Sequence, residues 1–290
     1  MATLLVICAA LIGQAPPAPR AVTDKVAVEH AGRRIDVYTY RPPSFARGPL
    51  LVVFHGAGRN AEQYRDDARA LGDRFGMLVA APRFDEERFS SSHYHRGGLI
   101  VDDQVRPRSE WTWGFVPKIV AELRRAEQRP DMPYYLLGHS AGGQFLARMA
   151  GIHPLDAERI VAVNPSAYLL PSRDESFPYG FGGLPGELSS ADALRRYLAQ
   201  PLTIYLGALD NQLDESLDQG AGANRQGANR NERGRNIYRA AEQLARTNGW
   251  EFRWALVEAA GVGHDHRGMF DSPACQMALF GPAENGRPRP

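Results

Sequence analysis

The sequence predicts an α/β fold with a mostly parallel central sheet, helices on both faces and an N-terminal antiparallel hairpin. From residue 50 onward, short continuous apolar runs alternate with helical patterns, as is typical of strands covered on both faces. Polar, glycine-rich segments follow several of these runs directly. Because ligands bind beyond the carboxyl ends of the strands in such sheets, we expect a functional site at that edge.

The expected hairpin precedes the parallel part of the sheet. Apolar and polar side chains alternate over residues 26–30 and 35–40, on either side of an Ala31-Gly32 turn, and Pro42 ends the second strand. The further expected strands are residues 50–54, 77–81, 134–137, 160–163, 202–206 and 252–257. Helices are expected over residues 61–75, 111–127 and 235–247, and a further helix is expected after Ser140. In the second of these, the first regular turn is expected near Pro117.

Three segments lack a stable period. Residues 84–109 are interpreted as a long loop near one end of the sheet. Residues 166–190 are rich in Pro, Gly and aromatic side chains and are interpreted as a lid or pocket wall, with a surface excursion as the alternative. Residues 220–234 are interpreted as a solvated loop rich in Asn, Gly and Arg rather than as a binding site for an anionic group.

The composition favours one domain. A chain of 290 residues with 43% apolar side chains can bury a substantial core, and residues 21–290 are expected to form it. The net charge is +1 and residues of both signs are interspersed, so the sequence shows no basic stretch of the kind that binds nucleic acid or an anionic membrane. The expected partner is therefore a small or neutral molecule.

Residues 1–20 are interpreted as a secretory signal followed by a Pro-rich mature start. The apolar run Leu4–Ile12 is far shorter than the ~20 residues that span a bilayer, and no basic residue precedes it. We expect a secreted or periplasmic protein, with a buried or disordered N-terminal tail as the alternative. Cys8 would leave with the signal, so Cys275 is interpreted as a buried apolar residue rather than as a nucleophile.

Residues 134–148 carry the clearest chemical signal. An expected strand, residues 134–137, runs into Gly-His-Ser-Ala-Gly at residues 138–142, and an apolar-faced helix follows. Glycines on both sides of Ser140 allow the sharp strand-to-helix turn that exposes a nucleophilic hydroxyl at the top of a sheet. The sequence therefore predicts a nucleophile elbow at Ser140.

A serine nucleophile needs a base and an orienting carboxylate. Ser140, Asp210 and His264 follow strands in the order Ser, Asp, His that accompanies such an elbow. Asp214 and Asp218, deeper in the loop after Asp210, are the alternative acids. The alternative base is His266.

An acyl-transfer site also needs backbone N–H donors for the oxyanion. We expect one from Ala141, directly after the nucleophile. The second is expected from the His55-Gly56-Ala57 turn, with Ala57 ranked first and Gly56 second, because small residues let the backbone approach a ligand.

These segments resemble the α/β-hydrolases of the polyhydroxybutyrate depolymerase and feruloyl esterase-like group. The resemblance covers most of residues 50–280 and is carried by His-Gly-Ala-Gly-Arg-Asn-Ala at 55–61 with Tyr64, Gly-His-Ser-Ala-Gly-Gly at 138–143, Asp210, and Gly-His-Asp at 263–265. It implies an α/β-hydrolase fold and a serine carboxylic-ester hydrolase that works through an acyl-enzyme, with no metal or organic cofactor.

Departures from the group narrow the expected substrate. Extracellular polymer depolymerases of this group often carry disulfides and a separate substrate-binding domain, for which residues 21–290 leave no room. A soluble hydroxyalkanoate oligomer or an aromatic or short acyl ester is therefore expected, and Trp111, Trp113 and the aromatic residues of 168–181 either line its acyl pocket or pack in the core. The alternatives are a peptidase or acyltransferase with the same triad, or a non-catalytic binding protein.

Overall fold

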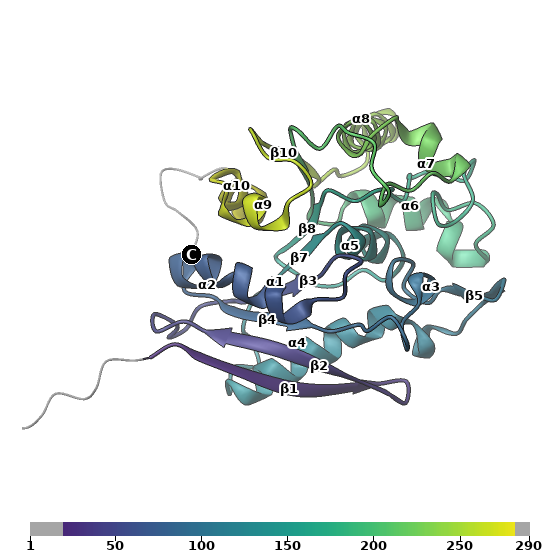
Figure 1. Cartoon of the computed structure of the whole chain (residues 1–290). Helices are drawn as coiled ribbons and strands as arrows, with labels where there is room; N and C mark the ends of the chain where they lie inside the picture. Colours follow the sequence, from purple (N-terminus) through teal and green to yellow (C-terminus); the bar gives the residue numbers. More distant parts are fainter. Residues whose placement is uncertain (1–19, 282–290) are drawn as a thin grey trace, which may run out of the picture.

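The computed structural model describes residues 20–281 (Figure 1). Within them lies an eight-stranded sheet in the order β1-β2-β4-β3-β7-β8-β9-β10. Neighbouring strands from β4 to β10 are parallel, whereas β2 is antiparallel to both β1 and β4. This topology confirms the mostly parallel sheet and the N-terminal hairpin. The strands are β1 (Val22–His30), β2 (Arg33–Arg41), β3 (Leu50–Phe54), β4 (Leu78–Pro82), β7 (Tyr134–His139), β8 (Arg159–Val163), β9 (Leu202–Gly207) and β10 (Ala255–Ala259).

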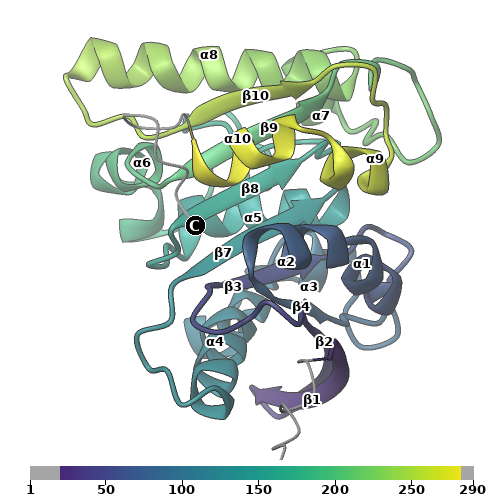
Figure 2. The ribbon, with the colours of Figure 1, turned by 90° about the vertical axis from the view of Figure 1, so that its left-hand side faces the viewer.

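Helices cover both faces of the sheet, and they divide the core into two parts. The helices on one face, in front of the sheet in Figure 2, are α1 (Ala61–Asp67), α2 (Arg69–Phe75), α9 (His266–Asp271) and α10 (Ala274–Phe280). Those on the other face are α4 (Phe115–Ala126), α5 (Ala141–Ile152), α6 (Ala191–Leu198) and α8 (Arg230–Asn248). Strands β3, β4 and β7 are buried along their whole length, which explains their continuous apolar runs.

Several boundaries differ from the sequence prediction. The helix expected over residues 61–75 is interrupted at Ala68, which separates α1 from α2. The last strand begins at Ala255 rather than near residue 252, because Trp254 packs into the core and its indole N–H donates to the carbonyl of Tyr197 (3.0 Å). The expected loop 84–109 contains a short helix α3 (Ser91–Tyr94) and the two-residue strands β5 (Ile100–Val101) and β6 (Gln104–Val105).

The interpretation of residues 220–234 as a solvated loop is wrong. This segment forms α7 (Ala221–Gln226) and the first turn of α8, which begins at Arg230. Asn229 caps α8, since its side chain accepts from the N–H of Glu232 (2.9 Å) while Glu232 accepts from the N–H of Ala228 (2.8 Å). Arg230 and Arg233 are fully buried, and described residues accept hydrogen bonds from all of their guanidinium nitrogens except Nε of Arg230.

Several of the aromatic residues considered for an acyl pocket belong to the core. Trp111 and Trp113 are buried, and their indole N–H groups donate to the carbonyls of Arg106 and Phe145. In the expected lid segment, Tyr168 and Phe181 are likewise fully buried. Core packing thus accounts for these side chains, and the lid role of residues 166–190 stays a prediction. The remaining short turns are η1 (Arg108–Glu110), η2 (Thr112–Gly114) and η3 (Gly186–Ser189).

The predicted signal sequence, including Cys8, lies outside the described residues. Cys275 is buried as expected, and burial raises the pKa of its thiol to about 12, so it is a poor nucleophile. No helix within residues 20–281 is long and apolar enough to cross a membrane.

Phe84 lies at the centre of an aromatic cluster on the helix α5 side of the sheet. Its ring lies 5.1 Å from that of Tyr94, 5.7 Å from that of Phe115 and 5.7 Å from that of Phe145, measured between centroids. We expect Phe84→Ala to lower the free energy of unfolding by ~3–5 kcal/mol, because it leaves a cavity among rings that cannot collapse into it. Urea denaturation measures this. Leu213→Ala, at a side chain 73% exposed, should change the unfolding free energy by less than ~0.5 kcal/mol, and a similar loss in both variants would contradict the prediction.

Candidate active site

Ser140 occupies the sharp turn between β7 and α5. Its backbone has φ +54° and ψ −112°, a left-handed conformation that a residue with a side chain rarely adopts. The N–H of Ser140 donates to the carbonyl of Val163 on β8 (2.8 Å), which fixes the turn to the neighbouring strand. The strained geometry is that of a nucleophile elbow.

Two glycines let the helix approach the sheet closely enough to form this elbow. A Cβ atom on Gly142 would lie 2.4 Å from the carbonyl oxygen of Phe54 at the end of β3. A Cβ atom on Gly138 would lie 2.4 Å from the carbonyl oxygen of Gly142. Both contacts involve backbone atoms that cannot move aside, so the Gly-x-Ser-x-Gly spacing follows from packing as much as from chemistry.

The three residues predicted for the triad meet at the carboxyl edge of the sheet. His264, in the loop after β10, places Nε2 3.2 Å from Ser140 Oγ and Nδ1 2.7 Å from Asp210 Oδ2. A carboxylate only accepts hydrogen bonds, so Nδ1 carries the proton and Nε2 is free to accept from the serine hydroxyl. The side chain of Asp210 is 3% exposed and that of His264 is 23% exposed, which leaves the base accessible and its partner shielded.

A buried arginine holds Asp210 from its other side. Arg230, the first residue of α8, donates from Nη1 to Asp210 Oδ1 (3.3 Å) and from Nη2 to Asp214 Oδ1 (2.8 Å). The pair with Asp210 is almost fully desolvated, and removing one partner of such a pair typically costs ~3–5 kcal/mol. Arg230 was missed by the sequence prediction. The Asn229-x-x-Glu232 capping pattern was the available signal that it starts a helix.

The alternative acids engage other partners. The hydrogen bonds of Asp214 to Arg230 and Ser216 hold the pKa of that carboxyl well below its usual range. Asp218 accepts from the hydroxyl of Tyr179 (3.1 Å) and the N–H of Gly220 (2.8 Å). Neither carboxylate contacts His264.

His266, the alternative base, points to a different carboxylate. Its Nε2 lies 2.8 Å from Asp67 Oδ2, and its ring stacks on that of Tyr64 with centroids 4.0 Å apart. The Tyr64 hydroxyl lies 3.0 Å from Nδ1 of His139, whose ring is 4.6 Å from that of His264. Burial, followed by the nearby histidines, lowers the pKa of His139 well below its usual range. His139 is therefore a neutral neighbour of His264 and adds no charge against its protonation.

The turn after β3 lies against the elbow. A Cβ atom on Gly56 would lie 3.7 Å from Cβ of Ser140 and 2.9 Å from the hydroxyl of Tyr64. Ala141 starts α5, so its N–H belongs to the first helical turn, where N–H groups lack intrahelical acceptors. The predicted oxyanion segments and Ser140 are thus neighbours.

His55 orients the peptide that carries the Ala57 N–H. Its Nδ1–H donates to the carbonyl of Gly56 (2.8 Å), and its Nε2 accepts from the N–H of Phe84 (3.1 Å). In a trans peptide the C=O and N–H groups point in opposite directions, so holding the Gly56 carbonyl toward buried His55 turns the Ala57 N–H away from it. This geometry favours Ala57 over Gly56 as the second oxyanion donor. The sequence offered no signal for this role of His55.

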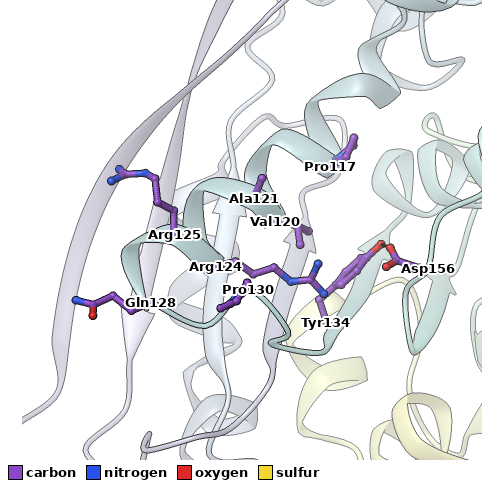
Figure 3. A pocket seen from close by; sticks show the side chains of 9 residues that line it. All are labelled: Pro117, Val120, Ala121, Arg124, Arg125, Gln128, Pro130, Tyr134 and Asp156. Carbon is purple, nitrogen blue, oxygen red and sulfur yellow. Dashed lines mark hydrogen bonds between the residues drawn. The ribbon is translucent and has the colours of Figure 1, made fainter.

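A large apolar pocket lies away from this site (Figure 3). It has a volume of about 540 Å³ and is formed by α4, the segment after it, and Tyr134 and Asp156 at the amino edge of β7 and β8. The Tyr134 hydroxyl donates to Asp156 (2.6 Å), and Arg124 covers its ring. Because this pocket is at the opposite sheet edge from Ser140, it does not serve the triad.

Comparisons with known proteins agree with this architecture. Poly(aspartic acid) hydrolase-1 from Sphingomonas sp. KT-1 is 31% identical and superposes with a TM-score of 0.80 over 87% of this chain and 96% of that one. The poly(3-hydroxybutyrate) depolymerase LpqC from Bordetella parapertussis is 33% identical, with a TM-score of 0.79 over 86% of this chain and 87% of that one. A monoglyceride lipase from Rattus norvegicus is 30% identical over 128 residues, which span 43% of this chain and 38% of the lipase. No protein-family model matches the sequence.

The parallel sheet, the elbow and these relatives define a hydrolase. The chain belongs to the α/β-hydrolase serine esterase group, as its sequence resemblance indicated. Ester hydrolysis in general is the activity that these hydrolase relatives support.

Buried His55 makes stability depend on pH. Burial lowers the pKa of this imidazole from 6.5 to about 3 in the folded chain. The unfolded chain therefore binds a proton that the folded chain does not over this range, and the free energy of unfolding should fall as the pH is lowered from 6.5 toward 3. We expect His55→Asn to reduce this slope by about 1.4 kcal/mol per pH unit.

Urea denaturation at a series of pH values measures the slope. Gln212→Asn, an exposed control, should retain the wild-type slope. An unchanged slope in His55→Asn would show that folding does not lower the pKa of His55.

Proposed function

We propose that this protein hydrolyses carboxylic esters through an acyl-enzyme formed on Ser140. The observation that carries the proposal is the position of His264, whose two ring nitrogens face Ser140 Oγ and Asp210 Oδ2 at 3.2 and 2.7 Å. A serine hydroxyl is a weak nucleophile until a neutral imidazole accepts its proton. The carboxylate of Asp210 holds the required tautomer and stabilises the imidazolium that forms.

The proposed reaction has two halves. Ser140 Oγ attacks the acyl carbon while His264 Nε2 takes its proton, and the negative charge on the carbonyl oxygen is stabilised by the N–H groups of Ala57 and Ala141. The C–O bond to the alcohol then breaks, and the alcohol leaves with the proton from His264. A water molecule, deprotonated by the same imidazole, attacks the acyl-enzyme, and the acid is released as Ser140 recovers its proton.

The proposed substrate is a hydroxyalkanoate oligomer or an aromatic or short acyl ester. The likeness to a poly(3-hydroxybutyrate) depolymerase over most of both chains supports the first of these. The N-terminal sequence pattern supports an exported enzyme that meets such esters outside the cytoplasm.

A second candidate is hydrolysis of an amide linkage by the same three residues. The likeness to poly(aspartic acid) hydrolase-1 favours it, because the triad fixes the nucleophile but not the leaving group. A panel of p-nitrophenyl esters beside the matching p-nitroanilides separates ester from amide hydrolysis.

Ser140→Ala should abolish both covalent labelling by a fluorophosphonate and hydrolysis of p-nitrophenyl butyrate. The expected loss in kcat is ~10⁴-fold or more, because the acyl-enzyme can no longer form. Circular dichroism checks that the variant is folded, and Ser91→Ala, at an exposed serine, should keep wild-type turnover. Retained turnover in Ser140→Ala would refute the mechanism.

Asp210→Asn and Asp214→Asn form a matched pair, because both remove one negative charge beside Arg230. Only Asp210 contacts His264, so we expect kcat to fall by ~10³-fold to 10⁴-fold in the first variant and by less than ~10-fold in the second. The rate of p-nitrophenyl butyrate hydrolysis decides the ranking. The reverse order would assign Asp214 as the acid.

A further inference from the structure

Three arginines gather beside the segment that follows β3, without a carboxylate partner. Arg59 comes from that segment, Arg96 from the loop after α3, and Arg148 from α5. Within residues 20–281, no Asp or Glu oxygen lies within 4.0 Å of their guanidinium nitrogens. We call these three residues the arginine cluster.

Contacts around His95 bring the cluster together. Arg148 donates from Nη1 to the carbonyl of His95 (3.2 Å). The guanidinium of Arg59 lies 4.7 Å from the ring centroid of Tyr94, which is itself 5.9 Å from the ring of His95. Arg96 is the next residue in the chain, and all three guanidinium groups act electrostatically on the His95 imidazole.

The members differ in how fully they are engaged. Fully buried Arg148 also donates to the carbonyl of Pro178 (3.0 Å), and Arg59 donates to the carbonyl of Phe84 (2.9 Å). These acceptors are neutral, so they satisfy hydrogen bonds without cancelling charge. Arg96 is half-buried and makes no hydrogen bond or ion pair with any described residue. Its donors are therefore available to a ligand.

Three acidic residues act on the cluster through space, and none of them forms an ion pair with it. Asp218, which acts on Arg148 through space, accepts from the hydroxyl of Tyr179. Asp85, which together with Glu86 acts on Arg59, is bound by Arg88. Within residues 20–281, Asp218 and Glu86 have no cationic partner, so two carboxylates oppose three guanidinium groups and the local balance is positive, although the net charge of the whole chain is only +1.

Two members of the cluster are connected to the elbow at Ser140. Arg148 Nη1 contacts Gln144 Oε1 (3.0 Å), and the N–H of Gln144 donates to the carbonyl of Ser140 (2.9 Å). These residues follow one face of α5 at successive turns, so the backbone of Arg148 is ~12 Å from that of Ser140. Arg59 lies three residues after Gly56, whose backbone borders Ser140.

We propose that the arginine cluster binds a free carboxylate on the alcohol side of the scissile ester, with Arg96 as the main contact. Among the proposed substrates, a hydroxyalkanoate oligomer has this chemistry, because its last unit ends in a carboxylate that lies beyond the ester bond. The preferred substrate is then a short oligomer with a free acid end, and the leaving alcohol is a hydroxy acid. This inference rests on the proposed ester hydrolysis at Ser140. A guanidinium that is charged and rich in donors suits a carboxylate better than a neutral ester or amide.

The test compares two substrates that differ only at the distal end. One is the dimer of 3-hydroxybutyrate with its free carboxylate, and the other is the same dimer with that carboxylate converted to a primary amide. Each contains a single ester, and release of the first hydroxybutyrate is followed by chromatography. For the wild-type protein we expect kcat/KM to be at least tenfold higher for the free acid, and the preference should shrink at high ionic strength.

Arg96→Gln should reduce the ratio of the two kcat/KM values at least fivefold, and Arg96→Lys should restore part of it. Arg106→Gln is the matched control, because it removes the same charge from the same segment, residues 84–109, but from an arginine that already pairs with Glu110 (2.7 Å). It should leave the ratio unchanged.

A second measurement covers the case in which Arg96→Gln does not fold. 3-Hydroxybutyrate, which is the leaving alcohol of the dimer, should inhibit wild-type hydrolysis of p-nitrophenyl butyrate competitively and more strongly than 3-hydroxybutyramide does. Equal kcat/KM values for the two dimers, an unchanged ratio in Arg96→Gln, or equal inhibition by 3-hydroxybutyrate and 3-hydroxybutyramide would overturn the carboxylate subsite while leaving ester hydrolysis intact. Failure of the wild-type protein to hydrolyse any of these esters would instead refute the proposed function.

Discussion

The backbone strain at Ser140 is the constraint on which the site depends. A non-glycine residue at φ +54° persists only where its surroundings leave no alternative. Here the Ser140 N–H is bound to β8, and the backbone of Gly142 lies against the end of β3. The elbow therefore requires three adjacent parallel strands in register, and the same register brings the segments after β3 and β7 beside each other.

Two buried groups, neither of which takes part in the reaction, hold the candidate site in shape. Arg230 shares its guanidinium between Asp210 and Asp214, so the orientation of the acid depends on the first turn of α8. His55 uses both ring nitrogens on backbone groups and so fixes the peptide between Gly56 and Ala57. In each case a polar group taken out of water binds protein partners in a specific geometry, which makes the arrangement rigid.

The buried arginines that stabilise the fold differ from Arg96 in the acceptors that surround them. Arg230 and Arg233 are buried with carboxylate, hydroxyl, amide or carbonyl acceptors, and their role in holding loops together is apparent from those contacts. Arg96 has no such partner, although it lies beside Arg148 in a region of positive charge. Arg96 therefore has the property expected of a group that meets a ligand, namely charge without a structural partner among residues 20–281.

The sequence by itself determined the fold class, the elbow and the order of the candidate triad. Those features depend on local patterns, namely apolar strands, glycines beside Ser140, and polar residues such as His264 placed just after strands. Only the tertiary structure decided between Asp210 and Asp214 as the neighbour of His264, because both lie in one loop and the choice depends on where Arg230 anchors each carboxylate. Only the tertiary structure also showed that residues 220–234, expected to form a solvated loop, are mostly helical and contain buried arginines. Burial of a charge depends on acceptors that are distant in sequence. Local chemistry is encoded in neighbouring residues, whereas hydrogen-bond partners across the sheet edge are set by the register of strands far apart in the chain.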